Sequence, residues 1–275
     1  MFVNRTISGV QDFLATRPVF TVAEFAEWYG SRRETRERTF EALLAYHIKR
    51  GHLVRIRKGL YAAVPPASTA ASVPIDPFLV AGKLTPDAIL AYHTALEFHG
   101  KAYSITHEFF CLTNLSARPL EFRGQQFKAV HSPAALRRKR AELVGVLTAE
   151  RMGFGVRVTS LERTMVDVLD RPHLGGGWEE IWRSLESVEF FDLQAVAEYA
   201  LLLGNTTTIA KVGFFLEQHK DALMVEERHL NPLRKHSPRV PHYLSRGNRR
   251  SGKLVAGWNL VVPPEVLERR WQEVA

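Results

Sequence analysis

The first 64 residues contain three helical patterns in close succession, and this feature limits the possible folds more than any other part of the chain. The first pattern runs over residues 7–14, where apolar side chains recur at helical spacing. The second and third begin at Thr21 and Ser31, each followed three positions later by a glutamate, which is the capping box of a helix start. Gly30 and Gly51 end these two patterns. Helices separated by so short a turn predict a helix-turn-helix.

A hairpin pattern follows the third helix. Residues 53–57 and 60–64 alternate apolar and polar side chains and are joined across Lys58-Gly59. Helix, helix-turn-helix and hairpin in this order predict a winged helix-turn-helix domain over residues 1–64. Residues 65–72 consist of Pro, Ala, Ser and Thr without apolar periodicity, which indicates a linker over residues 65–74. Behind it we expect a larger mixed α/β domain over residues 75–275.

The second domain contains patterns of both kinds, so the expected class of the chain is α+β. A helix is predicted to begin at Thr85-Pro86 and to stop at Gly100. A later helix is predicted to be capped by Thr159 and to run to Leu169. Strands are expected near residues 109–113, 120–122, 127–131, 156–158 and 258–262, and helices over residues 178–187, 193–203 and 209–219.

Positive charge is concentrated near both ends of the chain. The net charge is +8, from 37 Lys and Arg residues against 29 Asp and Glu residues. Residues 1–64 hold 11 basic and 6 acidic residues, and residues 228–253 hold 8 basic residues and no acidic residue. Such blocks favour a polyanionic partner, nucleic acid above all.

The third helix carries the side chains that a DNA major groove requires. With Phe40 and Leu44 facing inward, the opposite face presents arginine for guanine, threonine for bases or phosphates, and a small alanine that permits close approach. The arginines of its first turns oppose the helix dipole, and an external phosphate would relieve that conflict. Alternation in the hairpin places Arg55 and Arg57 on one outward face. The residues expected to contact DNA are Arg32, Arg33, Thr35, Arg36, Arg38, Thr39, Ala42, Tyr46, Arg55, Arg57 and Lys58.

Two alternatives accompany these basic segments. The arginine-rich helix face is also compatible with a solvated surface that carries i,i+4 ion pairs. The second basic block is expected either to contact a nucleic acid or a protein partner, or to be a plain solvated loop. Its candidate contact residues are Arg234, Lys235, Arg239, Arg246, Arg249 and Arg250.

The sequence contains no constellation typical of catalysis or metal binding. His93 and His99 fall on different faces of one predicted helix, and no hydrolase, metalloprotease or nuclease motif is found. We therefore expect no catalytic residue, metal or cofactor, and no enzyme activity. The single Cys111, the lack of a run of ~20 apolar residues and the lack of a secretion signal favour the cytoplasm and argue against a membrane protein.

Three segments together resemble the AbiEi family of antitoxins, over nearly the whole chain. They are residues 56–61 (Ile-Arg-Lys-Gly-Leu-Tyr), residues 90–96 with His99-Gly100, and residues 159–172, which include Glu162-Arg163-Thr164. The resemblance implies a transcriptional autorepressor from a bacterial type IV toxin–antitoxin pair. It implies that the winged helix binds operator repeats and that the second domain is involved in neutralising a nucleotidyltransferase toxin of the AbiEii type. If the operator repeats are inverted, two reading helices are needed on the DNA, so a homodimer is expected there.

The most distinctive of these motifs has a structural explanation as well as a functional one. Arg163 and Asp167 are spaced to form an ion pair along one helix face, and a contact with the toxin is the alternative. Residues 175–177, three glycines, are expected to be a loop between helices. Two other functions remain open: a ligand-responsive winged-helix regulator without a toxin partner, and a nucleic-acid-processing enzyme.

Overall fold

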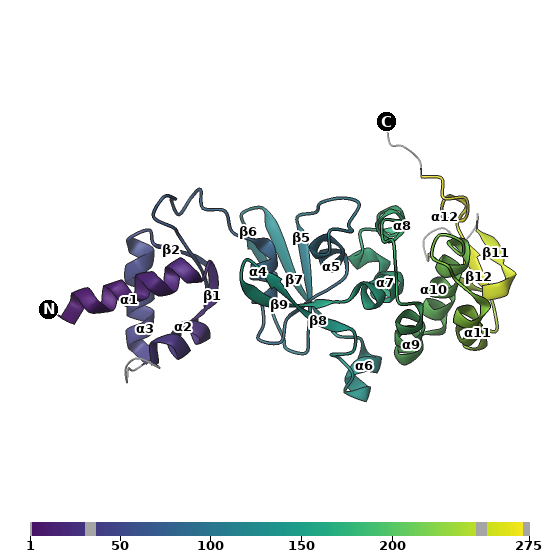
Figure 1. Ribbon diagram of the computed structural model, residues 1–275, viewed down its shortest axis with the longest axis horizontal. Coiled ribbons are helices and arrows are strands. Elements are labelled where there is room, and N and C mark those ends of the chain that lie inside the picture. Colours follow the sequence, from purple (N-terminus) through teal and green to yellow (C-terminus); the bar gives the residue numbers. More distant parts are fainter. Residues whose placement is uncertain (1, 31–36, 246–251, 272–275) are drawn as a thin grey trace.

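The computed structural model describes residues 2–30, 37–245 and 252–271, without the side chains of residues 2–8 and 37–39. Figure 1 shows the elements in a row, with the winged helix at the N-terminal side, a β-sheet in the middle and a helical part beyond it. Helices and sheets are mixed throughout, so the expected α+β class is confirmed. Each of these three parts is explained by sequence features of its own.

Residues 2–30 and 37–63 contain the helices and the hairpin of a winged helix-turn-helix, in the order that the sequence predicts. The Thr21 hydroxyl accepts from the Glu24 N–H at 3.2 Å, and the Thr21 N–H donates to the Glu24 carboxylate at 2.7 Å, which confirms the first capping box. The second, at Ser31 and Glu34, lies outside the described residues. Buried aromatic rings, among them Phe13, fill the core. The elements are α1 (Phe2–Thr16), β1 (Val19–Thr21), α2 (Val22–Gly30), α3 (Glu37–Lys49), β2 (Leu53–Arg57) and β3 (Leu60–Ala63), with strand order β1-β3-β2.

The middle of the chain forms a mixed sheet with strand order β6-β7-β5-β4-β9-β8 in the described residues. The expected strands in residues 109–131 and near 156–158 are confirmed, and β8 was not predicted. The elements of this part are α4 (Pro77–Gly82), β4 (Ile89–Leu90), α5 (His93–Phe98), β5 (Glu108–Thr113), β6 (Leu120–Phe122), β7 (Gln125–His131), α6 (Ala134–Lys139), β8 (Val146–Arg151) and β9 (Phe154–Thr159).

The prediction of a helix that begins at Thr85 is wrong. Ile89 and Leu90 form the short strand β4, which pairs antiparallel with β5 and parallel with β9. Both side chains are buried, because the two faces of the sheet are covered at this point. A short apolar run of this kind does not distinguish a buried strand from a helix by periodicity. The helix begins only at His93.

The helical part follows the predicted pattern closely. Ser160 caps α7 and Thr159 ends β9, so the predicted cap is wrong by one residue. Asp192 caps α9, and Gly204 ends it in the left-handed conformation, as the sequence indicates. The elements are α7 (Leu161–Asp170), η1 (Pro172–Leu174), α8 (Trp178–Glu186), α9 (Leu193–Leu203), α10 (Thr206–Gln218), α11 (Glu227–Lys235), β10 (His242–Tyr243), β11 (Lys253–Val255), η2 (Ala256–Trp258), β12 (Leu260–Val262) and α12 (Pro264–Leu267).

The sheet of the winged helix is apolar on both faces. Phe20, Tyr61 and neighbouring residues pack into the aromatic core beneath the helices. Ile56 and Leu60 instead belong to an apolar cluster that includes residues of α4 and of the central sheet. The wing therefore lies between its own helices and the rest of the protein, and its orientation is coupled to the central sheet.

Candidate nucleic-acid interface

The exposed face of α3, where its side chains are described, includes Ala42 and Tyr46 of the predicted contacts. Phe40, Leu44 and His47 are buried, and Ala42 and Tyr46 are exposed. A helix needs this arrangement to pack one face and present the other. The Arg50 guanidinium lies over the Tyr46 ring, 5.5 Å from its centroid. The face thus presents a small residue beside an aromatic ring and a cation, which suits close approach to a polyanion.

The remaining predicted contacts of this helix lie at its start. Arg32, Arg33, Thr35 and Arg36 lie outside the described residues. The backbone of Arg38 and Thr39 belongs to α3, and their side chains lie outside the description. The structure thus gives the position of α3, to which Arg38 and Thr39 belong.

A pair of histidines lies where the end of α3 meets β2. The Nδ1 atoms of His47 and His52 are 3.2 Å apart. Burial lowers the pKa of His47, and the neighbouring His52 lowers it further. A neutral His47 can pack in the core beneath the exposed face, so this residue supports the helix without adding charge to it.

The predicted DNA-contact residues of the wing lie in different surroundings. Arg55 is exposed and faces Tyr61 across the ladder, and Lys58 is exposed at the turn. Arg57 is half-buried, and its guanidinium donates to the carbonyl of Leu84 in the central part. The expectation that Arg55 and Arg57 share one outward face is therefore wrong. The pairing register shifts between the two residues, which breaks the simple alternation.

The second basic block is partly helical and partly paired. Residues 227–235 form α11, and Arg234 makes ion pairs with Glu217 and Glu227. Its guanidinium also lies 5.4 Å from the centroid of the Trp258 ring. These contacts make Arg234 a structural residue, which corrects its assignment as a candidate contact of a nucleic acid or a protein partner. Lys235 and Arg239 are exposed, and Arg246, Arg249 and Arg250 lie outside the described residues.

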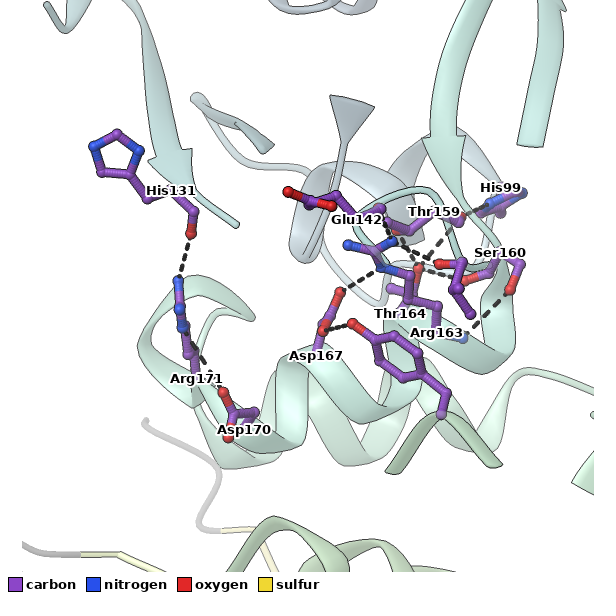
Figure 2. Close-up of polar contacts among 12 residues, drawn as sticks. His99, His131, Glu142, Thr159, Ser160, Arg163, Thr164, Asp167, Asp170 and Arg171 are labelled. Atoms are coloured by element: carbon purple, nitrogen blue, oxygen red, sulfur yellow. Dashed lines mark hydrogen bonds and ion pairs between the residues drawn. The ribbon is translucent and has the colours of Figure 1, made fainter. Parts of the chain in front are cut away.

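The distinctive motif of α7 forms a buried polar network (Figure 2). Arg163 and Asp167 pair at 3.2 Å, with 1% of each side chain exposed. The Tyr199 hydroxyl donates to Asp167 at 2.7 Å, and Arg163 donates to the carbonyls of Glu142 and Val144. Burial raises the pKa of Asp167, and the Arg163 charge and the Tyr199 hydrogen bond oppose that effect. The predicted ion pair is confirmed, and its burial excludes a direct contact with a partner.

The histidines that the sequence singles out are used as hydrogen-bonding groups. His93 bonds Glu180 at 3.0 Å, and the ring of His99 bonds the carbonyl of Thr159 at 2.8 Å. Within residues 2–30, 37–245 and 252–271, no group of three or more His, Cys, Asp or Glu residues could hold a metal ion. Residues 175–177 form the expected loop, between η1 and α8.

Sequence reasoning missed a second set of cations near the wing. Lys83, at the end of α4, and Arg157, on β9, line the same groove as Lys58. Their positions in the sequence are separated by long segments, so only the packing of the sheet against the wing brings them together.

The family comparison concerns the N-terminal part. Residues 10–64 match the AbiEi antitoxin family of transcriptional regulators. The AbiEi resemblance expected from the motifs is confirmed over this segment. The AbiEi match supports a DNA-binding regulator, in a family that is regulatory and not enzymatic.

Two further comparisons concern the whole chain. The fold is similar to that of the RV2827C protein from Mycobacterium tuberculosis, with a TM-score of 0.60 and 19% identity, over 94% of this chain and 90% of that one. At this identity the likeness shows the shared fold alone. No curated protein matches the sequence. Among the described residues, no helix is both long and apolar enough to cross a bilayer.

Proposed function

We propose that the protein is a sequence-specific DNA-binding antitoxin that represses its own operon and neutralises a nucleotidyltransferase toxin. The observation that carries the DNA-binding role is the exposed face of α3, because it lies within the segment that matches a family of regulators. A helix presented in this way can enter a major groove while the preceding helix contacts the DNA backbone. In this proposal the protein acts in the cytoplasm, without cofactor or catalytic activity.

The proposed DNA surface combines α3 with the exposed strand of the wing. Ala42 permits close approach, Tyr46 and Arg55 contact the duplex, and Lys58 can reach a phosphate. Arg57 remains part of the proposed surface only through its backbone position, because its side chain is engaged by Leu84. The proposed contacts also include Arg38 and Thr39 of α3, and Arg32, Arg33, Thr35 and Arg36 of the segment that precedes it in the sequence.

The proposed partners follow from the same role. An inverted operator repeat requires two copies of α3 about one turn of DNA apart, so a homodimer is expected on the operator. The toxin would meet a surface of residues 75–275, which we propose as a second domain behind a linker at residues 65–74. Lys235, Arg239, Arg246, Arg249 and Arg250 remain proposed contacts of this second domain with a nucleic acid or with the toxin.

A mobility-shift titration of the promoter DNA tests the DNA-binding role. Arg55→Ala should weaken binding by ~1 kcal/mol and lower the slope of log affinity against log salt by about one, because one phosphate contact is lost. Tyr46→Ala should weaken binding to the operator more than binding to unrelated DNA if the ring contacts bases.

The matched control is Arg118→Ala, which removes the same charge from an exposed residue outside the winged helix. Its affinity and salt slope should equal those of the unaltered protein. Equal affinities for Arg55→Ala, Tyr46→Ala and Arg118→Ala would contradict the proposed surface. Co-expression with the neighbouring gene, scored for growth arrest, tests the antitoxin role separately.

A second candidate function is a regulator that responds to a small ligand. One observation favours it, namely the positively charged groove between the wing and the central sheet. Absence of a toxin gene beside this one, together with unchanged growth on co-expression, would favour this candidate over the antitoxin.

A further inference from the structure

A groove of about 470 Å³ separates the tip of the wing from the central sheet. One wall consists of the wing turn at Lys58 and the first turn of α2, including Glu24. The other wall consists of Lys83 at the end of α4, the segment that follows it, and Arg157 on β9. Its volume lies in the range of small-molecule sites, roughly 300–1,000 Å³. The groove therefore has room for a ligand and has walls from two parts of the protein.

The lining of the groove is strongly basic. In the described part of the chain, its charged residues are four cations, Arg57, Lys58, Lys83 and Arg157, against one carboxylate, Glu24. Lys83 forms an ion pair with Glu24. Burial raises the pKa of Glu24, but hydrogen bonds from Lys83 and Thr21 outweigh it and the pKa is lowered overall. Glu24 is thus ionised and offsets one of the four positive charges.

Two of the cations are oriented by neutral acceptors. The Arg157 guanidinium donates to the carbonyl of Pro86 at 2.6 Å, and that of Arg57 donates to the carbonyl of Leu84. A carbonyl fixes a guanidinium in place without cancelling its charge, and each guanidinium retains further N–H donors. Lys58 is exposed at the rim. The buried side chains of Leu60 and Val156 form part of the lining, and an apolar floor strengthens attraction between the cations and an anion.

We propose that this groove is a binding site for a small anion with phosphate-type oxygens, which bridges the wing and the central sheet. The shared chemistry has two sources, a free phosphorylated small molecule and a backbone phosphate of bound DNA. Because the wing packs on the central sheet beside the groove, an occupant also affects the presentation of the proposed DNA surface. This last effect and the DNA-phosphate source rest on the proposed function; binding of a free anion does not.

Calorimetric titration of the full chain with inorganic pyrophosphate, at constant ionic strength, tests the site. The unaltered protein should bind pyrophosphate saturably with one site per chain. Lys58→Ala and Arg157→Ala should each weaken binding about tenfold, the usual loss for one charge-assisted hydrogen bond. The control Arg138→Ala removes an exposed cation from α6 and should leave the affinity unchanged.

The outcome that would overturn the site is clear for either variant. The proposal is refuted if pyrophosphate shows no saturable binding at millimolar concentration. It is also refuted if Lys58→Ala and Arg138→Ala bind pyrophosphate with equal affinity. Lys58 is exposed, so its replacement keeps the test valid if Arg157→Ala fails to fold. A thermal unfolding curve of each variant identifies such a failure.

Repeating the titration with saturating operator DNA separates the two sources. Unchanged pyrophosphate affinity assigns the groove to a free small anion. If pyrophosphate binds in the absence of DNA but not in its presence, the groove is assigned to a DNA phosphate. Pyrophosphate binding by a protein that binds no promoter DNA would contradict the proposed function and leave this site intact.

Discussion

The buried carboxylate of Glu180 accepts hydrogen bonds from His93, Ser104 and Ser184. His93 donates at 3.0 Å, the Ser104 N–H at 3.0 Å, the Ser104 hydroxyl at 2.7 Å and the Ser184 hydroxyl at 3.0 Å. Burial raises the pKa of Glu180, and the bonds from His93 and Ser104 outweigh this effect and lower it to about 2. The carboxylate is thus held ionised between α8, α5 and the loop before β5.

The lowered pKa of Glu180 makes the free energy of unfolding depend on pH. Because the folded pKa lies below the usual 4.5, Glu180 stabilises the fold above pH 4.5, and the gain is lost as the pH falls towards 2. The full contribution is up to about 3 kcal/mol. Glu180→Gln should be less stable at pH 7 and should lose less of its unfolding free energy between pH 5 and pH 3, measured by urea unfolding.

The comparison between variant and unaltered protein isolates this residue from other carboxylates. Equal losses between pH 5 and pH 3 would show that Glu180 does not titrate in this way. Glu179→Gln provides the matched control, because Glu179 is a half-buried neighbour on the same helix and its carboxylate pairs with Arg183 at 2.9 Å. A solvent-accessible i,i+4 pair of this kind contributes little, so this control should behave like the unaltered protein.

At the scale of elements, α10 supports the C-terminal sheet through one close contact. A Cβ atom placed on Gly213 would lie 2.1 Å from the ring of Trp258. That ring is fully buried, and its indole N–H donates to Glu217 at 2.7 Å. Gly213 therefore lets Trp258 lie directly on the helix backbone, which places η2 and β12 against α10.

Gly213→Ala tests this packing because two effects have opposite signs. Alanine favours a helix over glycine by about 1 kcal/mol, whereas overpacking a core costs about 1–3 kcal/mol. We expect net destabilisation in denaturant unfolding, since the Trp258 ring is fixed by its own hydrogen bond. In the background of Trp258→Phe the same substitution should cost less. A gain in stability from Gly213→Ala alone would contradict the contact.

At the scale of the whole molecule, the wing links the winged helix to the central sheet. We propose that residues 1–64 and 75–275 are separate domains joined at residues 65–74. The apolar cluster that contains Ile56, Leu60 and Phe78 lies across this boundary, and Lys83 pairs with Glu24 across it as well. The proposed domains therefore share buried surface, and they should unfold together.

Ile56→Ala should uncouple them. Removing this side chain, which is 7% exposed, should cost about 2–4 kcal/mol. Scanning calorimetry is expected to give one transition for the unaltered protein and two for the variant. Leu53→Ala is the control, because Leu53 lies on the same strand but in the aromatic core of the winged helix. It should lower the midpoint temperature of unfolding and still give a single transition. A single transition for Ile56→Ala would show that the wing does not couple the two parts.

Local signals determined much of this protein from the sequence alone. The capping box at Thr21, the hairpin after residue 53, and the helix limits at Asp192 and Gly204 are all written in a few adjacent residues. The pairing of Arg163 with Asp167 was also predictable, because both lie one turn apart on one helix. Of the three segments on which the AbiEi resemblance rests, residues 56–61 lie within the matched residues 10–64.

Only the tertiary structure decided features that depend on partners distant in the sequence. Ile89 and Leu90 form a strand because β5 and β9 pair with it on its two sides, although their local pattern does not distinguish a strand from a helix. Arg57 donates to the carbonyl of Leu84, and Arg234 pairs with Glu217. Both contacts also join residues that are distant in the sequence. Periodicity reports which face of an element is apolar, but the identity of the group that packs against it depends on burial and pairing across the whole chain.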